Sequence, residues 1–232
     1  MKTPAIKKLV AEAIGTFVIV LAATSVDILF YSGRVDDDVS RWLARGFVTA
    51  VVIYAFSDIS GAHVNPAITV GFALRRVFSW TLVLPYWIAQ FAGAFAASAL
   101  LGALFGAAML GLGASHPGPG FSPLVAVVCE VVLTFIIMIV ILLTGRNKDG
   151  VGKQSALAVG LAVAACGLFA GPISGASMNP ARSIAPQMLA GRTDISWIYA
   201  VGPLLGAAIA VGTHWWLCGD PTRSERETAR GS

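Results

Sequence analysis

Two short segments carry polar residues whose types and spacing suggest a defined chemistry: "SGAHVNPAIT" (Ser60–Thr69) and "SGASMNPARS" (Ser174–Ser183). Each segment holds the triplet Asn-Pro-Ala, and the six residues are Asn65, Pro66, Ala67, Asn179, Pro180 and Ala181. Asparagine is a preferred N-cap and proline is favoured at the first helical position, so each triplet predicts the start of a helix. The carboxamides of Asn65 and Asn179 can donate hydrogen bonds to a passing oxygen atom, which is a chemistry of binding.

The segments around these two motifs are those of a membrane protein. Of the 232 residues, 56% are hydrophobic and 12% are charged, whereas soluble domains are about 25% charged. Six apolar segments reach the roughly 20 residues that a membrane-spanning helix needs, at 7–30, 41–57, 80–106, 123–144, 155–171 and 196–217. The helices predicted after the motifs, at 66–76 and 180–190, have only half that length. They must lie on the surface or dip into the membrane under the cover of other helices.

The two halves of the sequence repeat in the same order. The segment "AEAIGTFVIVL" (Ala11–Leu21) matches "CEVVLTFIIMI" (Cys129–Ile139), and "YWIAQFAGAFAASAL" (Tyr86–Leu100) loosely matches "YAVGPLLGAAIAVGT" (Tyr199–Thr213). Each half holds three spans, and an odd number requires the second half to be inserted upside down relative to the first. We predict one transmembrane channel domain over residues 1–232. Its parts are a first repeat at about 5–106, a loop at 107–122, a second repeat at about 123–218 and a cytoplasmic tail at 219–232.

The inversion brings the two short helices together near the membrane centre, N-terminus to N-terminus. Their positive dipole ends then converge, which repels protons and cations while Asn65 and Asn179 offer donors to a neutral solute. Paired broken segments in an inverted repeat are typical of a site at the midplane. The sequence therefore favours a pathway for neutral molecules at this place.

Two glutamates occupy equivalent places in the repeat, Glu12 and Glu130, each inside an apolar helix. Ionisable side chains at such depth are rare and usually functional. A loop that enters the membrane leaves N–H groups without water, and a nearby carboxylate can accept from them. We interpret both glutamates as supports of these loops, the alternative being a position at the lipid interface. His63 is expected either to line the channel or to hold its loop by hydrogen bonds.

The basic residues predict the orientation. Six spans place both termini on one side, together with eleven of the sixteen basic residues: Lys2, Lys7, Lys8, Arg75, Arg76, Arg146, Lys148, Lys153, Arg223, Arg226 and Arg230. The other five are Arg34, Arg41, Arg45, Arg182 and Arg192. This bias predicts that both termini are cytoplasmic. The short tails are typical of a bacterial inner-membrane protein, which is the localisation that we expect.

With "AEAIGTF", "ISGAH" and "NPARS", the two motifs resemble the major intrinsic proteins, the aquaporin and aquaglyceroporin family, over residues 5–218. The segment "GPISGASMNPARSIAP" (Gly171–Pro186) is especially similar to the nodulin-like branch and its bacterial relatives. The resemblance implies an all-α membrane protein with six transmembrane helices and two re-entrant half-helices, and a homotetramer with one pore per subunit. Asp58 replaces a histidine that is common in the family. We expect a more acidic mouth, or pairing of Asp58 with Arg75 or Arg76.

In this family selectivity depends on a ring of four residues, which counting from the motifs places at Arg45, Gly167, Ala176 and Arg182. Arg182 matches the pore arginine of the family, whose forked donors can bind a hydroxyl group while its charge repels cations. Because Gly167 and Ala176 are small, we expect a wide ring. Such a ring would admit water, glycerol-type polyols and uncharged metalloid hydroxides such as arsenous, silicic and boric acids.

Arg45 leaves two interpretations open. It can fill the space beside Gly167 and Ala176 and narrow the pore to that of a water-selective aquaporin. Alternatively, it can reach outward to the acidic cluster Asp36–Asp38 and leave the ring open. We favour the outward position, because Arg41 lies one turn earlier on the same helical face and supports a charged vestibule.

Other functional classes find less support. An ion-coupled transporter needs ionisable residues for coupling, and an ion channel needs rings of carbonyl groups or acidic side chains. The sequence shows no nucleophile–base pair of the kind that an enzyme uses. Cys129, Cys166 and Cys218 are far apart and predict neither a disulfide framework nor a metal site. We therefore expect no enzymatic activity, cofactor, metal or nucleic-acid partner, and take the lipid bilayer, water and small neutral solutes as the partners.

Overall fold

A computed structural model describes residues 3–146 and 153–231, which form helices joined by loops. Six of these helices are long and apolar enough to cross a membrane. They are α1 (Ala5–Tyr31), α2 (Asp38–Ser60), α4 (Val83–Phe105), α6 (Pro123–Thr144), α7 (Lys153–Ser174) and α9 (Ser196–Cys218), with a 3-10 turn η1 (Trp80–Leu82) leading into α4. The six spans predicted from the sequence are confirmed.

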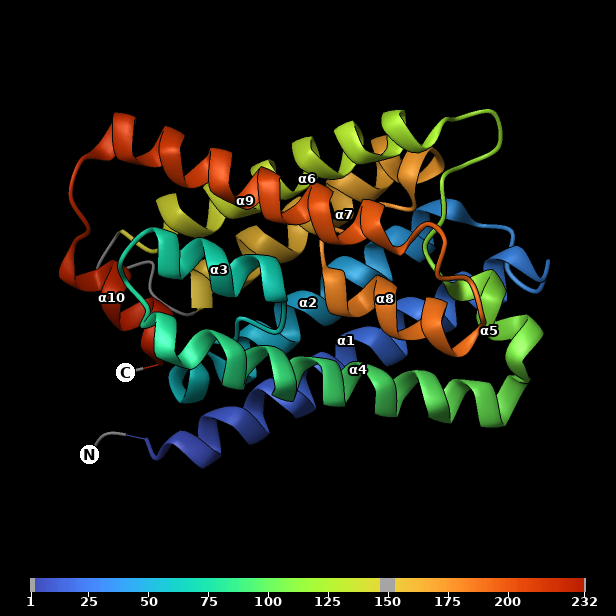
Figure 1. Cartoon of the computed structure of the whole chain (residues 1–232), viewed down its shortest axis with the longest axis horizontal. Coiled ribbons are helices and arrows are strands. Elements are labelled where there is room, and N and C mark those ends of the chain that lie inside the picture. The colour runs from blue at the N-terminus through green and yellow to red at the C-terminus, as the bar shows by residue number, and fades with distance from the viewer. Residues whose placement is uncertain (1–2, 147–152, 232) are drawn as a thin grey trace.

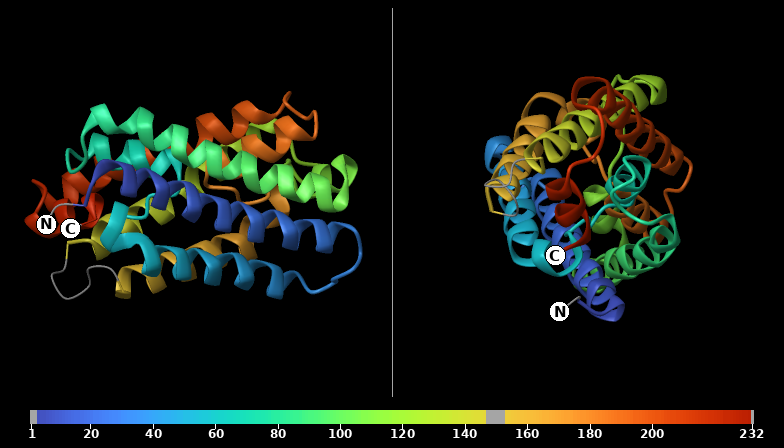
Figure 2. Two further views of the ribbon diagram at one scale, coloured as in Figure 1. Left: turned by 90° about the horizontal axis from the view of Figure 1, so that it is seen from below. Right: turned by 90° about the vertical axis from the view of Figure 1, so that its left-hand side faces the viewer.

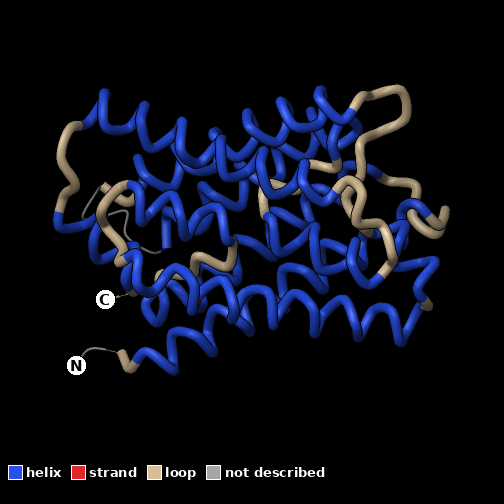
Figure 3. Tube along the Cα trace, viewed as in Figure 1, coloured by secondary structure: helices blue, strands red, loops and turns tan. Residues whose placement is uncertain are grey.

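The two half-length helices are also confirmed, as α3 (Pro66–Leu74) and α8 (Pro180–Leu189). Both lie among the long helices, α3 toward the end of the molecule that holds both termini and α8 toward the opposite end (Figure 1). We call these the terminal end and the far end. The loops that precede the two helices enter the interior of the molecule, where Figure 3 shows loop segments between the surrounding helices.

The long helices approach closely where glycine lies at their contacts. The most extensive contacts join α1 with α4, α6 with α9, and α2 with α7. A side chain at Gly93 of α4 would overlap the carbonyl of Ala13 in α1, and a side chain at Gly206 of α9 would overlap the carbonyl of Val131 in α6. In a bilayer, helices associate largely through such close packing. Because the two glycines and the two carbonyls are equivalent in the repeat, the same contact is built twice.

Two further helices differ from the expectation. Segment 107–122 is not only a loop, because it contains α5 (Ala107–Gly113), and the tail contains α10 (Arg223–Arg230). The hydroxyl of Thr222 accepts from the N–H of Glu225, and the Glu225 carboxylate accepts from the N–H of Thr222. This capping box starts α10. Seen along the long axis, the C-terminal segment lies across the terminal end of the helix ring (Figure 2).

The outer surface of the helices suits a lipid environment. Leu104, Leu124 and Trp216 are 66%, 70% and 84% exposed, respectively. The chain is thus an integral membrane protein that crosses the bilayer several times. The two described ends of the chain lie at the same end of the molecule, as six spans require (Figure 1). Of the basic residues expected there, Lys2 and Lys148 lie outside the described residues.

Candidate central cavity and its two ends

The two Asn-Pro-Ala triplets start helices as predicted. The side-chain oxygen of Asn65 accepts from the N–H of Ala67 at 2.9 Å, and that of Asn179 accepts from the N–H of Ala181 at 3.0 Å. A proline at the first position of each helix needs no such acceptor, because it has no N–H. The side-chain oxygen of each asparagine is therefore bonded to its own helix, and its NH₂ group is available to other partners.

The NH₂ groups of the two asparagines join the two halves of the chain. Asn65 donates from Nδ2 to the carbonyl of Met178 at 2.7 Å, and Asn179 donates from Nδ2 to the carbonyl of Val64 at 2.9 Å. Each bond runs from one repeat to the loop of the other. Because an NH₂ group has two hydrogens, one hydrogen of each asparagine is left for a further acceptor.

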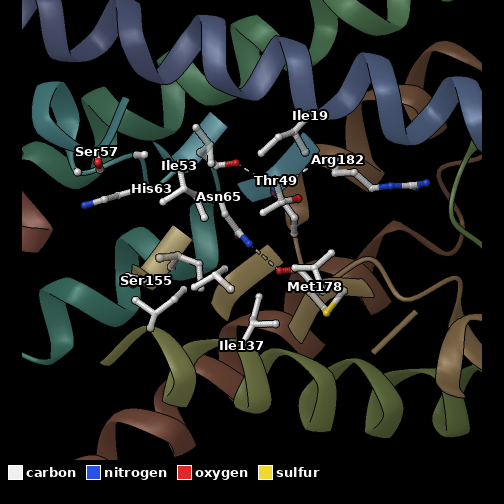
Figure 4. A pocket seen from close by; sticks show the side chains of 18 of the residues that line it. Ile19, Thr49, Ile53, Ser57, His63, Asn65, Ile137, Ser155, Met178 and Arg182 are labelled. Carbon is white, nitrogen blue, oxygen red and sulfur yellow. Dashed lines mark hydrogen bonds between the residues drawn. The ribbon is translucent and has the colours of Figure 1, made fainter. Parts of the chain in front are cut away.

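Both asparagines line a cavity that runs between the helices. Asn65 lies centrally in Figure 4, with His63 and Arg182 on opposite sides of it. Arg45 and Thr49 add polar groups to the wall. The other residues that line the cavity are largely apolar and include Ile19, Ala23, Ile53, Ile68, Phe72, Ile137, Val159 and Val163. A mainly apolar wall with a few placed polar groups is typical of a site for a small molecule.

Glu12 holds the first re-entrant loop. Its Oε1 accepts from the hydroxyl of Ser60 at 2.7 Å and from the N–H of His63 at 2.9 Å. Its Oε2 accepts from the N–H of Val64 and from the side-chain amide of Gln90, both at 2.7 Å. The carboxylate is fully buried. It thus gives acceptors to backbone donors that have no water in the membrane interior.

Glu130 holds the second loop in the same way. It accepts from the hydroxyl of Ser174 at 2.7 Å, from the N–H of Ser177 at 2.8 Å and from the N–H of Met178 at 2.7 Å. Met178 and its counterpart Val64 have positive φ angles of 56° and 43°. Such angles are strained for residues with side chains, so they persist only where the surroundings hold them. The two carboxylates supply that hold.

His63 both lines the cavity and is fixed by hydrogen bonds, so its two expected roles coincide. Its Nδ1 lies 3.2 Å from the hydroxyl of Thr69, and its Nε2 lies 2.9 Å from the carbonyl of Ala229. Its ring also contacts three aromatic rings, those of Phe72, Phe78 and Tyr86. Both ring nitrogens therefore have protein partners.

Arg182 lies at the far end of the cavity and is 1% exposed. Its Nη1 donates to the hydroxyl of Ser115, and its Nη2 donates to the carboxylate of Asp27 and, at 3.5 Å, to the carbonyl of Gly113. Its Nε–H has no partner among the described residues. The guanidinium is thus held at one edge and has one donor to spare.

Arg45 does not reach outward to Asp36–Asp38, and the interpretation that we favoured for it is wrong. Its Nη1 donates to the carbonyl of Gly175 at 3.2 Å, and its Nη2 donates to the carbonyl of Ala176 at 2.8 Å. Its Nη1 also lies 3.6 Å from Asp27 Oδ2. These carbonyls belong to the second re-entrant loop, where Ala176 has a positive φ angle, and they hold the buried guanidinium inward. Arg45 therefore lines the cavity.

The acidic cluster is instead paired with Arg41. The Arg41 Nη2 lies 2.5 Å from Asp38 Oδ1, while its Nη1 lies 3.8 Å from Asp27 Oδ1. Its guanidinium stacks 4.0 Å from the Phe30 ring centre and 4.3 Å from that of Trp42. One turn of helix therefore separates an arginine that faces the outer loop from Arg45, which faces the cavity.

The two small residues expected in the ring do not leave it open. A side chain at Gly167 would overlap the indole of Trp42, which is 1% exposed. Ala176 is fully buried, and its carbonyl binds Arg45. Neither Gly167 nor Ala176 is among the described residues that line the cavity. Trp42 and Arg45 of α2 occupy the space that the small side chains leave.

Sequence reasoning missed Asp27 and Trp42 at this end. Asp27 is an ionisable residue inside an apolar span, which is itself a signal of function, but it lies far along the chain from its partner Arg182. Trp42 gave no such signal, because a buried tryptophan is ordinary. In the part of the chain that the structure describes, no group of three or more His, Cys, Asp or Glu residues is placed to hold a metal ion.

At the terminal end, α10 supplies the partners that we expected of Asp58. Arg75 donates from Nε to Glu225 Oε1 at 3.0 Å, and the carbonyl of Arg76 accepts from Arg226 at 3.0 Å. Asp58 itself is exposed, and in the described part of the chain no ion pair joins it to Arg75 or Arg76, so the expected pairing is wrong. Burial disfavours the charged form of Glu225, but the N–H of Thr222 and the guanidinium of Arg75 outweigh it and lower its pKa.

Comparisons with known proteins agree with this geometry. The sequence model of the family described as "Major intrinsic protein" matches residues 1–214. The chain is 38% identical over 227 residues to aquaporin NIP2-1 of Oryza sativa subsp. japonica, which covers 95% of this chain and 73% of that protein. It is 40% identical over 202 residues to putative aquaporin NIP4-1 of Arabidopsis thaliana, covering 86% and 70%. Its fold matches that of the aquaglyceroporin from Plasmodium falciparum with a TM-score of 0.81, at 23% identity, over 90% of this chain and 95% of that one.

Proposed function

The chain belongs to the major intrinsic protein family of membrane channels, and from this premise we propose that it conducts water and small uncharged polar solutes passively. The observation that carries the proposal is the cavity in which two helix N-termini meet. There each asparagine has a hydrogen free for an oxygen atom of a solute, while apolar side chains form most of the wall. A solute that moves along this wall exchanges few hydrogen bonds at a time and needs no charge partner.

Exclusion of protons and cations is part of the same proposal. The N-termini of α3 and α8 carry positive partial charges, and both point to the cavity centre. Arg45 and Arg182 add positive charge at the far end, where both are buried. A cation that enters from the far end would therefore be repelled first by the arginines and then by the helix N-termini beside the two asparagines.

We propose glycerol-type polyols and metalloid hydroxides, such as arsenous, silicic and boric acids, as solutes besides water. The similarity to NIP aquaporins supports this choice. The donor left over on Arg182 supports it as well, since a molecule with several hydroxyl groups needs donors. One observation favours a second candidate, a water-selective channel: Arg45 points inward and takes up space at the same end.

Swelling of proteoliposomes, followed by stopped flow, distinguishes the two candidates. We expect proteoliposomes to shrink faster than empty liposomes as water leaves, and to re-swell faster as glycerol or arsenous acid enters. Fast water flow without entry of glycerol or of any metalloid hydroxide would exclude the wide-solute proposal and leave the water-selective one. Arg45→Ala then tests whether Arg45 causes water selectivity, because glycerol entry should rise only if Arg45 narrows the pathway.

We also propose a homotetramer in a bacterial inner membrane, with the terminal end in the cytoplasm. The basic residues gathered at the terminal end support this orientation. The exposed apolar surfaces of the outer helices support contact with lipid or with copies of the chain. Native mass spectrometry of the detergent-solubilised protein would show the tetramer. The orientation can be tested with a cysteine placed in the C-terminal tail of the protein in right-side-out vesicles. Labelling of this cysteine by a membrane-impermeant reagent would contradict a cytoplasmic tail.

A further inference from the structure

We propose that Asp27 positions Arg182 and sets the net charge at the far end of the cavity, and so determines which solutes pass. The inference rests on the proposed channel function and deepens it. Asp27 lies in α1, is 5% exposed and faces guanidinium groups from two other helices. It is a positioning residue, because it acts on solutes through the two arginines that line the cavity.

One carboxylate serves two cations at this place. Asp27 Oδ2 accepts from Arg182 Nη2 and lies 3.6 Å from Arg45 Nη1. Arg41 is farther from Asp27, at 3.8 Å, and has its own partner in Asp38 at 2.5 Å. The two cavity-lining arginines and Asp27 therefore carry one net positive charge together.

The two arginines depend on Asp27 to different degrees. Arg45 is anchored by two carbonyls of its loop, which hold it whether or not Asp27 is charged. The other partners of Arg182 are the neutral hydroxyl of Ser115 and a long contact to a carbonyl. Without the carboxylate, the two guanidinium groups would repel each other in a medium of low dielectric constant. Arg182, which is the more weakly anchored one, would then move into the cavity that both line.

The test compares Asp27→Asn with Asp27→Glu in proteoliposomes, with the ratio of glycerol flux to water flux as the readout. We expect Asp27→Asn to lower this ratio by at least about tenfold, because a buried charge that loses its partner is strongly destabilised in place and Arg182 then moves into the cavity. Asp27→Glu should stay near the parent, because it keeps the charge.

Asp36→Asn is the matched control, since it removes an exposed carboxylate at the same end. If Asp27→Asn conducts both solutes in the parent ratio, the inference is wrong. It is equally wrong if Asp27→Glu shows the same altered ratio as Asp27→Asn, because Asp27 would then be a packing residue. A parent protein that conducts neither solute would contradict the proposed function instead.

A separate observation concerns the terminal end, where we infer that α10 closes the cavity. The carbonyl of Ala229 lies 2.9 Å from His63 Nε2, and Thr228 lines the same cavity as His63. A side chain at Gly61 would come within 2.7 Å of the Ala229 carbonyl, so the last turn of α10 presses directly against the first re-entrant loop.

Contacts on several sides keep α10 across the opening. Arg75, just after α3, binds Glu225, and the carbonyl of Gly145, just after α6, accepts from the hydroxyl of Ser224 at 2.8 Å. From α1, Lys8 donates to the carbonyl of Arg230. Nearly all these contacts are polar. They can therefore be exchanged for water without exposing a large apolar surface, and α10 is suited to detach and return.

Two opposite changes test the closure. Ending the chain after Cys218 removes α10, and we expect water flux to rise several-fold. Linking Gly145→Cys to Thr228→Cys in a Cys218→Ser background should fix the helix in place, because a Cβ at residue 145 would lie 3.5 Å from Thr228 Cγ2. Oxidation should then lower the flux below that of the parent, and a reductant should restore it.

Arg223→Ala is the control, because it removes an exposed ion pair with Glu227 that lies within α10 itself. Its flux should equal that of the parent. The closure is refuted if the shortened chain, folded as judged by its thermal unfolding, conducts no faster than the parent. A cross-link that forms completely and leaves the flux unchanged refutes it as well, and this outcome remains available if the shortened chain fails to fold.

Discussion

In the first repeat, the residue after Pro66 and Ala67 is Ile68, and in the second repeat the equivalent residue is Arg182. Likewise His63, two residues before Asn65, corresponds to Ser177. Both side chains line the cavity, Ile68 from α3, which lies toward the terminal end, and Arg182 from α8, which lies toward the far end (Figure 1). One end thus presents charge and the other an apolar and aromatic surface. In an inverted repeat, single differences of this kind make the two ends of an otherwise symmetric cavity chemically different.

The frame itself is the same in both halves. The hydroxyl of Tyr86 donates to the carbonyl of Ser60 at 2.9 Å, and that of Tyr199 donates to the carbonyl of Ser174 at 2.7 Å. The glutamates accept from equivalent backbone N–H groups. What is shared holds the loops, and what differs faces the solute. The comparison between the two halves can be tested at both levels.

The largest effect is expected from removing a loop-holding carboxylate. Glu12→Ala and Glu130→Ala each leave several buried donors without an acceptor, so each should lower the free energy of unfolding by at least about 3 kcal/mol. Denaturant unfolding in detergent micelles measures this, with the exposed Glu227→Ala as control. If only one of the two variants were destabilised, the loops would not be held in the same way.

The next effect concerns the paired glycine contacts. Gly93→Ala and Gly206→Ala push a methyl group into a backbone carbonyl of the adjacent helix, and each should cost about 1–3 kcal/mol of stability. Gly212→Ala is the matched control, because a Cβ there would meet nothing within 4 Å. Equal losses at Gly93 and Gly206 would show that the two halves of the chain pack in the same way. A loss at Gly212 as large as at Gly93 would show that intrinsic helix effects dominate.

A smaller effect is expected where the halves differ. Arg182→Ile makes the second repeat resemble the first and removes one positive charge from the far end. We expect a small cation leak, limited by Arg45 and by the two helix N-termini that remain. A pH-sensitive dye inside proteoliposomes detects it as proton entry. Ile68→Val serves as the counterpart at the other end and should conduct no protons. Proton entry in both variants would contradict the assignment of the barrier to Arg182.

The smallest effect is expected from acid at the terminal end. Because the pKa of Glu225 is lowered below its usual 4.5, its ion pairs stabilise docking of α10 above that pH and are lost as the pH falls below it. Three residues face this carboxylate: Arg75 just after α3, Arg146 just after α6, and His214 in α9. The protection of α10 against hydrogen exchange, taken relative to the intrinsic exchange rate at each pH, should therefore fall in acid. In Glu225→Gln, the amides of α10 should already exchange faster at neutral pH. An unchanged rate in that variant would show that the ion pairs of Glu225 do not hold α10 in place.

The parts of the fold that follow from local rules could be predicted. Segment lengths gave the spans, and Asn65 and Asn179 marked the starts of the half-helices, because capping needs only neighbours in the sequence. Arg45 was misplaced for the opposite reason. Its spacing from Arg41 shows which face of α2 both share, but the carbonyls that attract Arg45 belong to Gly175 and Ala176 in the other repeat.

Two other features needed the tertiary structure. The width beside Gly167 depends on Trp42, which fills the space that glycine leaves, so a small residue in the sequence did not mean a wide opening. α10 is strongly polar and carries no apolar pattern. Its capping box at Thr222 and Glu225 was readable, but its docking depends on Arg75 and His63 far earlier in the chain.

The exchange of hydrogen bonds between the two asparagines also bears on how the protein is made. When the first half leaves the ribosome, the carbonyl that Asn65 will bind belongs to Met178, 113 residues further along the chain. The first re-entrant loop therefore cannot complete its bonding until most of the second half has been translated and inserted. Two half-chains produced separately in one cell would carry the same mutual requirement. Each would act as the template on which the other finishes folding.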